Sequence, residues 1–127
     1  MNNKDLEKKI KSIAHSLIYE KGYVCSLDVL MRLDYLSKRD YEAWRFGKIP
    51  YLEKACQVNL SKLSFINKTI RKIANDLDLK KSWTGYNQYG KSKKRRLRFS
   101  KSGDKNIEAV YATHYVDIER LNELKNQ

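Results

Sequence analysis

Chain-breaking residues are scarce in this sequence, which contains one proline and five glycines among 127 residues. This scarcity excludes long flexible linkers and low-complexity arms. Disorder is excluded as well, because hydrophobic residues make up 41% of the chain and a chain of this length can bury a core. We therefore expect one domain that spans the whole chain.

Long apolar runs are also missing. No run approaches the roughly 20 residues that a membrane-spanning helix requires, and the N-terminal MNNKDLEKKIKS lacks the apolar core of a secretory signal. We therefore predict a cytoplasmic protein with no membrane partner. The two cysteines, Cys25 and Cys56, lie among apolar residues, so we expect buried, reduced thiols, with a disulfide or redox pair as the alternative.

Motifs for catalysis or cofactor binding are absent too: there is no Walker-type loop, no dinucleotide fingerprint, no CxxC and no HExxH. A catalytic interpretation would need His114 together with a carboxylate such as Glu42, Asp104 or Glu108. The acids are scattered, however, and a histidine in a strand beside aromatic residues is usually a structural hydrogen-bonding group. We therefore predict that the protein is not an enzyme and that it holds no metal and no cofactor.

Positive charge is concentrated in residues 80–101, KKSWTGYNQYGKSKKRRLRFSK. This segment holds nine of the 27 Lys and Arg residues and no Asp or Glu. Without it, 18 basic and 15 acidic residues would remain, and the formal net charge would fall from +12 to +3. The segment also contains Trp83, Tyr86, Tyr89 and Phe99. Basic side chains interleaved with aromatic ones suit a phosphate backbone and its bases.

Helical patterns dominate the first two thirds of the chain, residues 4–79. Apolar residues recur at helical spacing over residues 59–78, and Ser37 is placed as the N-cap of a helix over residues 38–46. A shorter helix is predicted over residues 27–33. Together with the helix over residues 38–46, it suits a helix-turn-helix arrangement or any small helical bundle.

The last third, residues 81–116, favours strands. Aromatic and alternating residues predict a β-hairpin with a basic tip, formed by residues 82–89 and 95–100, and residues 111–116 predict a third strand. A final helix is expected over residues 117–125. The predicted fold is therefore α+β: helices followed by a small antiparallel sheet with a basic hairpin, in winged-helix-like order.

The helix over residues 59–78 has a polar face opposite its apolar stripe. Such a face suits the major groove of DNA, where basic and amide side chains read base edges, although it also suits plain solvent exposure. We expect the basic hairpin to lie beside this face, so that both contact one polyanion. The predicted nucleic-acid-binding residues are Ser61, Ser64, Lys68, Arg71, Lys72, Lys91, Lys93, Lys94, Arg95, Arg96, Arg98 and Lys101.

The predicted function is binding of nucleic acid, with double-stranded DNA first. The first alternative is RNA, for which Trp83, Tyr86 and Tyr89 would be stacking surfaces. The second alternative is an interaction or regulatory module whose basic hairpin docks on an acidic protein partner. Salt-dependent affinity for duplex DNA would favour the DNA-binding prediction, since each neutralised phosphate releases counterions.

An aromatic cluster precedes the long polar helix, in the stretch DYEAWRFGKIPYLEKA, residues 40–55. Tyr41 and Trp44 share a helical face, with Arg45 and Phe46 beside them. One interpretation is a satellite core that fixes the corner between two helices. Another is an aromatic patch for a protein partner or a base. A third is that Arg45 is a buried anchor that orients the hairpin.

Five segments, in this order, resemble a family of small bacterial proteins of uncharacterised function: DYEAWRFGKIPYLE, LSKLS, SWTGYNQYG, LRFSKSGD and YATHYV. The resemblance covers residues 22–116. It implies a single bacterial cytoplasmic domain, and it brings no activity, cofactor or catalytic residue.

Overall fold

Seven helices and a small antiparallel sheet make up the part of the chain that the structure, a computed structural model, describes: residues 2–90 and 95–127. This confirms the α+β prediction. The helices are α1 (Asn3–Lys21), α2 (Ser26–Arg32), α3 (Lys38–Arg45), α4 (Leu52–Ala55), α5 (Leu60–Asp76), α6 (Lys105–Ala112) and α7 (Ile118–Lys125). The strands are β1 (Tyr23–Cys25), β2 (Lys80–Trp83) and β3 (Thr113–Val116).

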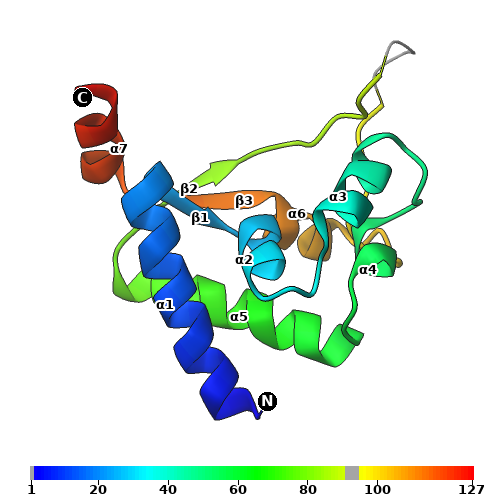
Figure 1. The fold of residues 1–127 in the computed structure, drawn as a ribbon, viewed down its shortest axis with the longest axis horizontal. Coiled ribbons are helices and arrows are strands. Elements are labelled where there is room, and N and C mark those ends of the chain that lie inside the picture. Colours follow the sequence, from blue (N-terminus) through cyan, green and yellow to red (C-terminus); the bar gives the residue numbers. More distant parts are fainter. Residues whose placement is uncertain (1, 91–94) are drawn as a thin grey trace.

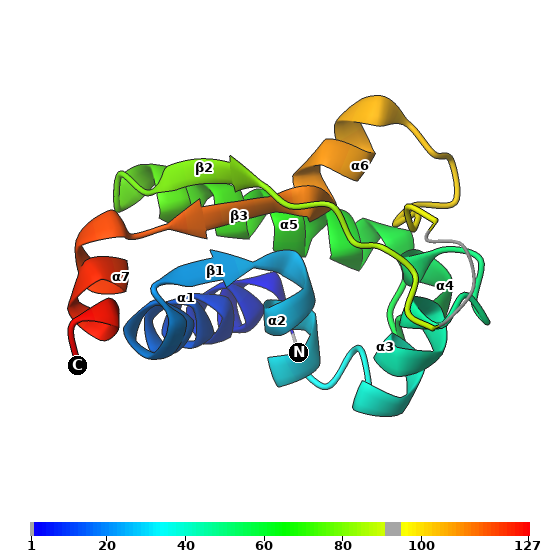
Figure 2. The same cartoon turned by 90° about the horizontal axis from the view of Figure 1, so that it is seen from above.

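The sheet has the strand order β1-β3-β2, with β3 antiparallel to both neighbours (Figure 2). Tyr115, in the middle of β3, faces Val24 on one side and Lys81 on the other. The third partner is therefore β1, from the mainly helical N-terminal part. The sequence allows a short extended piece at residues 23–25, but it did not predict that this piece joins the sheet. β1 is three residues long, too short to show the alternation that identifies a strand from sequence.

The predicted hairpin is wrong in extent. After β2 ends at Trp83, residues 84–90 and 95–100 make a single isolated bridge, between Asn87 and Arg96. The backbone N–H of Thr84 donates to the carbonyl of Ala112 at 2.8 Å, and beyond that point the chain leaves the sheet. The two arms of the loop are joined around this bridge by backbone bonds from Gln88 N–H to the Arg95 carbonyl at 2.7 Å and from Leu97 N–H to the Tyr86 carbonyl at 2.8 Å. Contacts with Arg45 of α3 hold the loop in addition.

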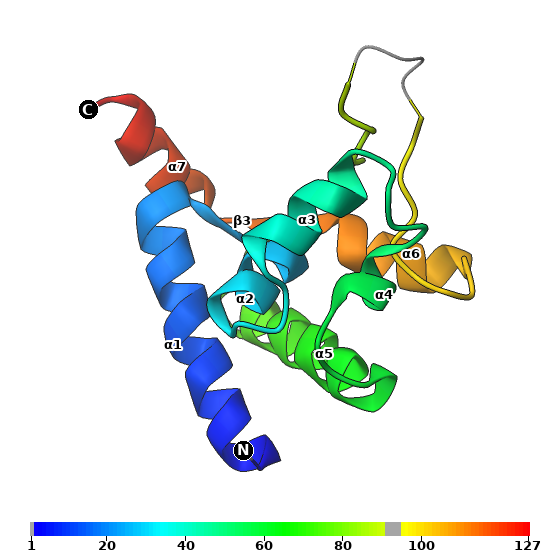
Figure 3. The same ribbon diagram turned by 45° about the vertical axis from the view of Figure 1, so that its right-hand side comes forward.

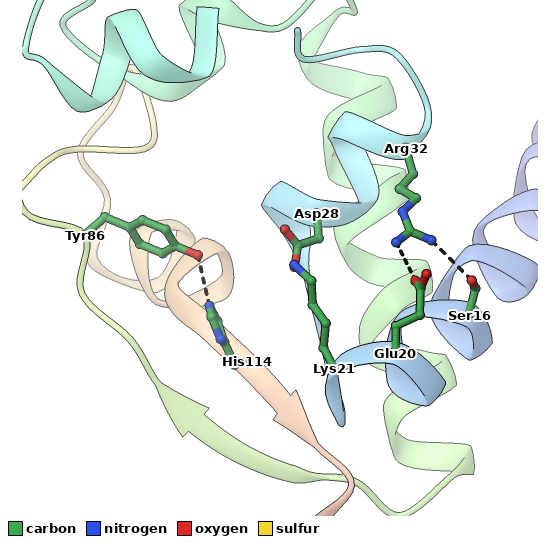
Figure 4. A network of polar contacts seen from close by, with 7 residues as sticks. All are labelled: Ser16, Glu20, Lys21, Asp28, Arg32, Tyr86 and His114. Carbon is green, nitrogen blue, oxygen red and sulfur yellow. Dashed lines mark hydrogen bonds and ion pairs between the residues drawn. The ribbon is translucent and has the colours of Figure 1, made fainter. Parts of the chain in front are cut away.

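In the view of Figure 1, α5 lies below the sheet and α1 rises past α5 to the level of β1, and the apolar stripes of both helices are buried in the core. Polar contacts fasten α2 to the end of α1, as Figure 4 shows: Arg32 donates to Glu20 and Ser16, and Lys21 pairs with Asp28 at 3.1 Å. α3 begins as predicted, with the Ser37 hydroxyl accepting the backbone N–H of Asp40.

Aromatic residues fill the corner between α3 and α4, but they belong to the main hydrophobic core and do not form the separate satellite core that one interpretation predicted. Trp44 is fully buried, and its ring centroid lies 5.4 Å from that of Phe99 and 5.8 Å from that of Tyr86. The indole Nε1–H donates to the carbonyl of Arg98 at 2.9 Å. Trp44 therefore ties α3 to the segment that carries the arginines.

Both cysteines are buried and unpaired, as predicted. Burial raises the pKa of the Cys25 thiol to about 12, and it raises the pKa of the Cys56 thiol to about 12 as well. Among the helices of the described residues, none combines the length and apolar character needed to cross a bilayer.

Candidate nucleic-acid interface

The polar flank of α5 lies at the surface, as the sequence predicted. Asn59 caps the helix by accepting the backbone N–H of Lys62 at 2.8 Å. Leu63, Ile66 and Ile70 are buried on the inner side. The outward-facing residues of the predicted interface are all exposed: Ser61, Ser64, Lys68, Arg71 and Lys72. Of these, Lys72 pairs with Glu7 of α1 at 3.7 Å.

A groove of about 730 Å³ separates α5 from the segment that leads into α6. Lys68 and Arg71 stand on the α5 wall, and Lys101 stands on the opposite wall. Over residues 2–90 and 95–127, no carboxylate lies within 4.0 Å of the side-chain nitrogens of these three residues. Three cations from two distant parts of the chain thus share one groove.

Two glutamates hold the segment that delivers Lys101. The carboxylate of Glu108 accepts the backbone N–H of Phe99 at 3.0 Å, and it accepts both the N–H and the hydroxyl of Ser100, at 2.7 and 2.5 Å. Glu53 accepts the backbone N–H of Lys101 at 2.9 Å. The sequence analysis did not predict either role. For Glu53, no local pattern links the side chain to a residue 48 positions away.

Arg95, Arg96 and Arg98 are exposed and line a second hollow of about 380 Å³, beside the turn that follows α3. The guanidinium of Arg98 lies over the ring of Tyr51, 5.6 Å from its centroid. No carboxylate of the described residues comes within 4.0 Å of any of the three guanidinium groups. The predicted contacts of Lys91, Lys93 and Lys94 lie outside the described residues.

The sequence predicted that the basic loop lies beside α5, and this prediction is wrong for residues 84–90 and 95–98. Figures 1 and 3 show α5 along the bottom of the view and residues 84–90 and 95–100 rising towards the top, with α3 and α4 between them. The connection runs through the chain itself, which passes from the second hollow at Arg96 to the first groove at Lys101. Five residues span at most about 18 Å, so the two cationic surfaces are close neighbours.

Arg45 anchors the loop, as the third interpretation of its cluster predicted, although its side chain is half-buried and not fully buried. Its Nη1 donates to the Tyr41 hydroxyl and its Nη2 to the carbonyl of Asn87, both at 3.1 Å. The guanidinium lies 3.9 Å from the ring centroid of Tyr89, whose backbone N–H donates to the Arg45 carbonyl at 2.7 Å. These contacts fix the position of residues 87–89 relative to α3.

The three aromatic residues predicted to stack on bases have different environments. Trp83 is 60% exposed, and Arg96 lies over one face of its ring, 4.8 Å from the centroid. Tyr86 is buried, so it is a core residue and not the stacking surface that the sequence predicted. Tyr89 is partly exposed, but the guanidinium of Arg45 covers one face of its ring.

His114 makes structural contacts of the predicted kind. Its Nε2 lies 3.0 Å from the Tyr86 hydroxyl (Figure 4), and its ring stacks on that of Tyr23 with 4.9 Å between centroids. Burial lowers the pKa of His114. Of the carboxylates considered for catalysis, Asp104 accepts backbone N–H groups at the start of α6, and Glu108 binds residues 99 and 100.

Within residues 2–90 and 95–127, no group of three or more His, Cys, Asp or Glu side chains is placed to hold a metal ion. Comparisons of the chain with protein-family models, with curated proteins and with solved structures found no significant match in any of the three.

Proposed function

We propose that the protein binds nucleic acid, with duplex DNA as the preferred target. The observation that carries the proposal is the groove in which Lys68 and Arg71 of α5 face Lys101, with no ion pair to any of them among the described residues. Unpaired cations need not break an internal salt bridge before they contact a phosphate. Affinity from such contacts is dominated by counterion release.

A winged-helix arrangement is part of the same proposal. The succession of α1, β1, α2, α5, β2 and β3, with β3 between the other two strands, supports it. The chain adds α3 and α4 between α2 and α5, and α6 between β2 and β3. In this arrangement α5 is the recognition helix, and residues 84–90 and 95–112, between β2 and β3, belong to an enlarged wing. Ser61, Ser64, Lys68 and Arg71 would face the major groove, which is about 12 Å wide and admits one helix.

The aromatic side chains favour duplex DNA over single-stranded RNA. Stacking on unpaired bases needs exposed ring faces. Tyr86 is buried, and Arg45 occupies one face of Tyr89. Trp83 remains as an exposed ring, with Arg96 on one side of it. One partly covered platform is a weak basis for single-strand binding, whereas exposed cations suit a duplex backbone.

Fluorescence anisotropy of a labelled 20-base-pair duplex tests the proposal across a series of salt concentrations. Wild type is compared with the double variant Lys68→Gln/Arg71→Gln, which removes two charges from α5. If both side chains contact phosphates, the slope of log affinity against log salt falls in magnitude by about 1.8, because each contact contributes about 0.9. The double variant Arg95→Gln/Lys101→Gln tests the wing in the same way.

The matched control is Lys8→Gln/Lys11→Gln, which removes the same charge from exposed positions of α1. It is expected to leave the salt slope unchanged. Equal slopes for all three double variants would show that DNA responds only to net charge and would contradict the proposed interface. A single-stranded RNA that competes better than the duplex would favour the RNA alternative instead.

A further inference from the structure

We propose that the groove between α5 and α6 is also a binding site for a small organic anion with an apolar body. Such a ligand and DNA would use the same cations, so the bound ligand would reduce affinity for DNA. The ligand site stands on the groove itself. Only the competition step rests on the function proposed above.

The dimensions of the groove fit a small molecule. Its volume of about 730 Å³ falls within the range of about 300–1,000 Å³ that is usual for small-molecule sites. Small-molecule sites also combine mainly apolar walls with a few convergent polar groups. The second hollow, beside Arg95 and Arg96, is about half as large at 380 Å³.

Apolar side chains line the groove although they are open to solvent. Leu60, at the start of α5, is 57% exposed, and Ile107, in α6, is 42% exposed. Val110 lies one turn further along α6 and also lines the groove. A phosphate backbone would contact the cations but would leave most of this apolar surface in water. An apolar ligand body would cover it, which is favourable in proportion to the area removed from water.

The charge of the groove selects an anion. Lys68 and Arg71 face Lys101 across the groove, and Glu53 is the one carboxylate among the lining residues. Both oxygens of Glu53 accept hydrogen bonds from the protein: one from the backbone N–H of Lys101 at 2.9 Å, the other from the Tyr111 hydroxyl at 2.8 Å. The groove therefore carries three positive charges and one negative charge, and the negative group already has its hydrogen-bond partners within the protein. A ligand with a carboxylate or phosphate group complements this charge.

Isothermal titration calorimetry of the full chain with decyl phosphate, kept below its micelle concentration, tests the site. We expect saturable binding of one molecule per chain, and at least tenfold weaker binding of inorganic phosphate, which has no apolar body. Ile107→Ser should weaken decyl phosphate binding at least fivefold. Ile118→Ser is the matched control, because Ile118 is 47% exposed on α7, away from the groove. Lys68→Gln should also weaken binding, whereas Arg39→Gln, at an exposed position of α3, should not.

DNA affinity separates this inference from the proposed function. Saturating decyl phosphate should weaken duplex binding at least fivefold in wild type, with little effect in Ile107→Ser, which keeps its cations and its DNA affinity. If decyl phosphate does not bind, or binds Ile107→Ser as well as wild type, the ligand site is refuted whatever the DNA result. If it binds as expected and DNA does not bind, the proposed function fails and the ligand site stands.

The same headgroup chemistry occurs in membranes. Vesicles of phosphatidylglycerol present it on a surface, and a flotation assay with these vesicles is the second arm of the test. Binding to vesicles together with no binding of free decyl phosphate would overturn the assignment to a small ligand. Weak or absent vesicle binding, together with saturable decyl phosphate binding, supports it.

Discussion

Replacing Glu108 with alanine tests whether one carboxylate holds the cationic segment in place. The side chain accepts the backbone N–H groups of Phe99 and Ser100 and the hydroxyl of Ser100. Both of these residues are buried, with exposed fractions of 3% and 1%. Water therefore does not readily replace the carboxylate in the variant, and the donors are left without an acceptor.

The magnitude follows from the number of buried donors. A buried donor that loses its partner costs about 1–3 kcal/mol, and partial rearrangement offsets some of this cost. We expect Glu108→Ala to lower the free energy of unfolding by about 3 kcal/mol, a large part of the 5–15 kcal/mol that is typical of a domain. Glu108→Gln keeps one acceptor oxygen, so we expect a loss of about half that size, roughly 1.5 kcal/mol.

Urea denaturation followed by tryptophan fluorescence measures these losses. Glu42→Ala is the matched control, because Glu42 is exposed on α3 and a surface substitution of this kind usually changes stability by less than about 0.5 kcal/mol. If Glu108→Ala costs no more than Glu42→Ala, other contacts hold residues 99–101, and the reasoning from buried donors is wrong.

The DNA affinity of Glu108→Gln provides a second, sharper readout in the folded state. The substitution removes a negative charge, so long-range electrostatics alone would strengthen binding to a polyanion. If the carboxylate positions Lys101, however, its loss should weaken binding at least threefold. A tighter complex would show that net charge matters and the position of the segment does not.

Three further predictions concern buried groups. Trp44→Phe, which loses the Nε1–H bond to a backbone carbonyl, should cost about 2 kcal/mol in urea denaturation, whereas Trp83→Phe, at an exposed position, should cost less than about 0.5 kcal/mol. Burial lowers the pKa of His114 below the 6.5 of a free side chain, so protonation favours the unfolded state. Stability should fall as pH drops below 6.5, a dependence that His114→Gln should remove and His15→Gln should retain. The two buried cysteine thiols should react with a disulfide reagent at pH 8 much more slowly in the native protein than in urea, and fast native labelling of both would contradict their burial.

Local patterns predicted the helices well because helix formation depends on neighbouring residues. The cap at Ser37 and the buried stripe of α5 both appear where spacing and residue type place them. One of three interpretations of the aromatic cluster had Arg45 as an anchor of the loop. Its contact with Tyr41, four residues away on the same helix, is local, whereas its contacts with Asn87 and Tyr89 depend on the tertiary structure.

The sheet could not be predicted in the same way. β1 pairs with β3, so that Cys25 lies opposite His114 in the sheet. A strand of three residues is too short to be identified by the alternation of its side chains. Residues 82–89 were predicted as a strand because they are rich in aromatic residues. In the structure Tyr86 and Gln88 make backbone hydrogen bonds with the predicted partner arm, residues 95–100, whereas Asn87 and Tyr89 bond to Arg45.

The amino-acid sequence by itself determined that most of the excess positive charge lies in residues 80–101 and that α5 has one apolar side and one polar side. Both are properties of adjacent residues and hold in any fold. Tertiary structure alone decided that Lys101 would join Lys68 and Arg71 in one groove and that Tyr86 would be buried. These outcomes depend on contacts that no helix or strand pattern specifies. Glu53 accepts the backbone N–H of Lys101 from 48 positions away, and Glu108 accepts that of Ser100 from eight positions away. No local pattern specifies which carboxylate will hold a given backbone N–H group.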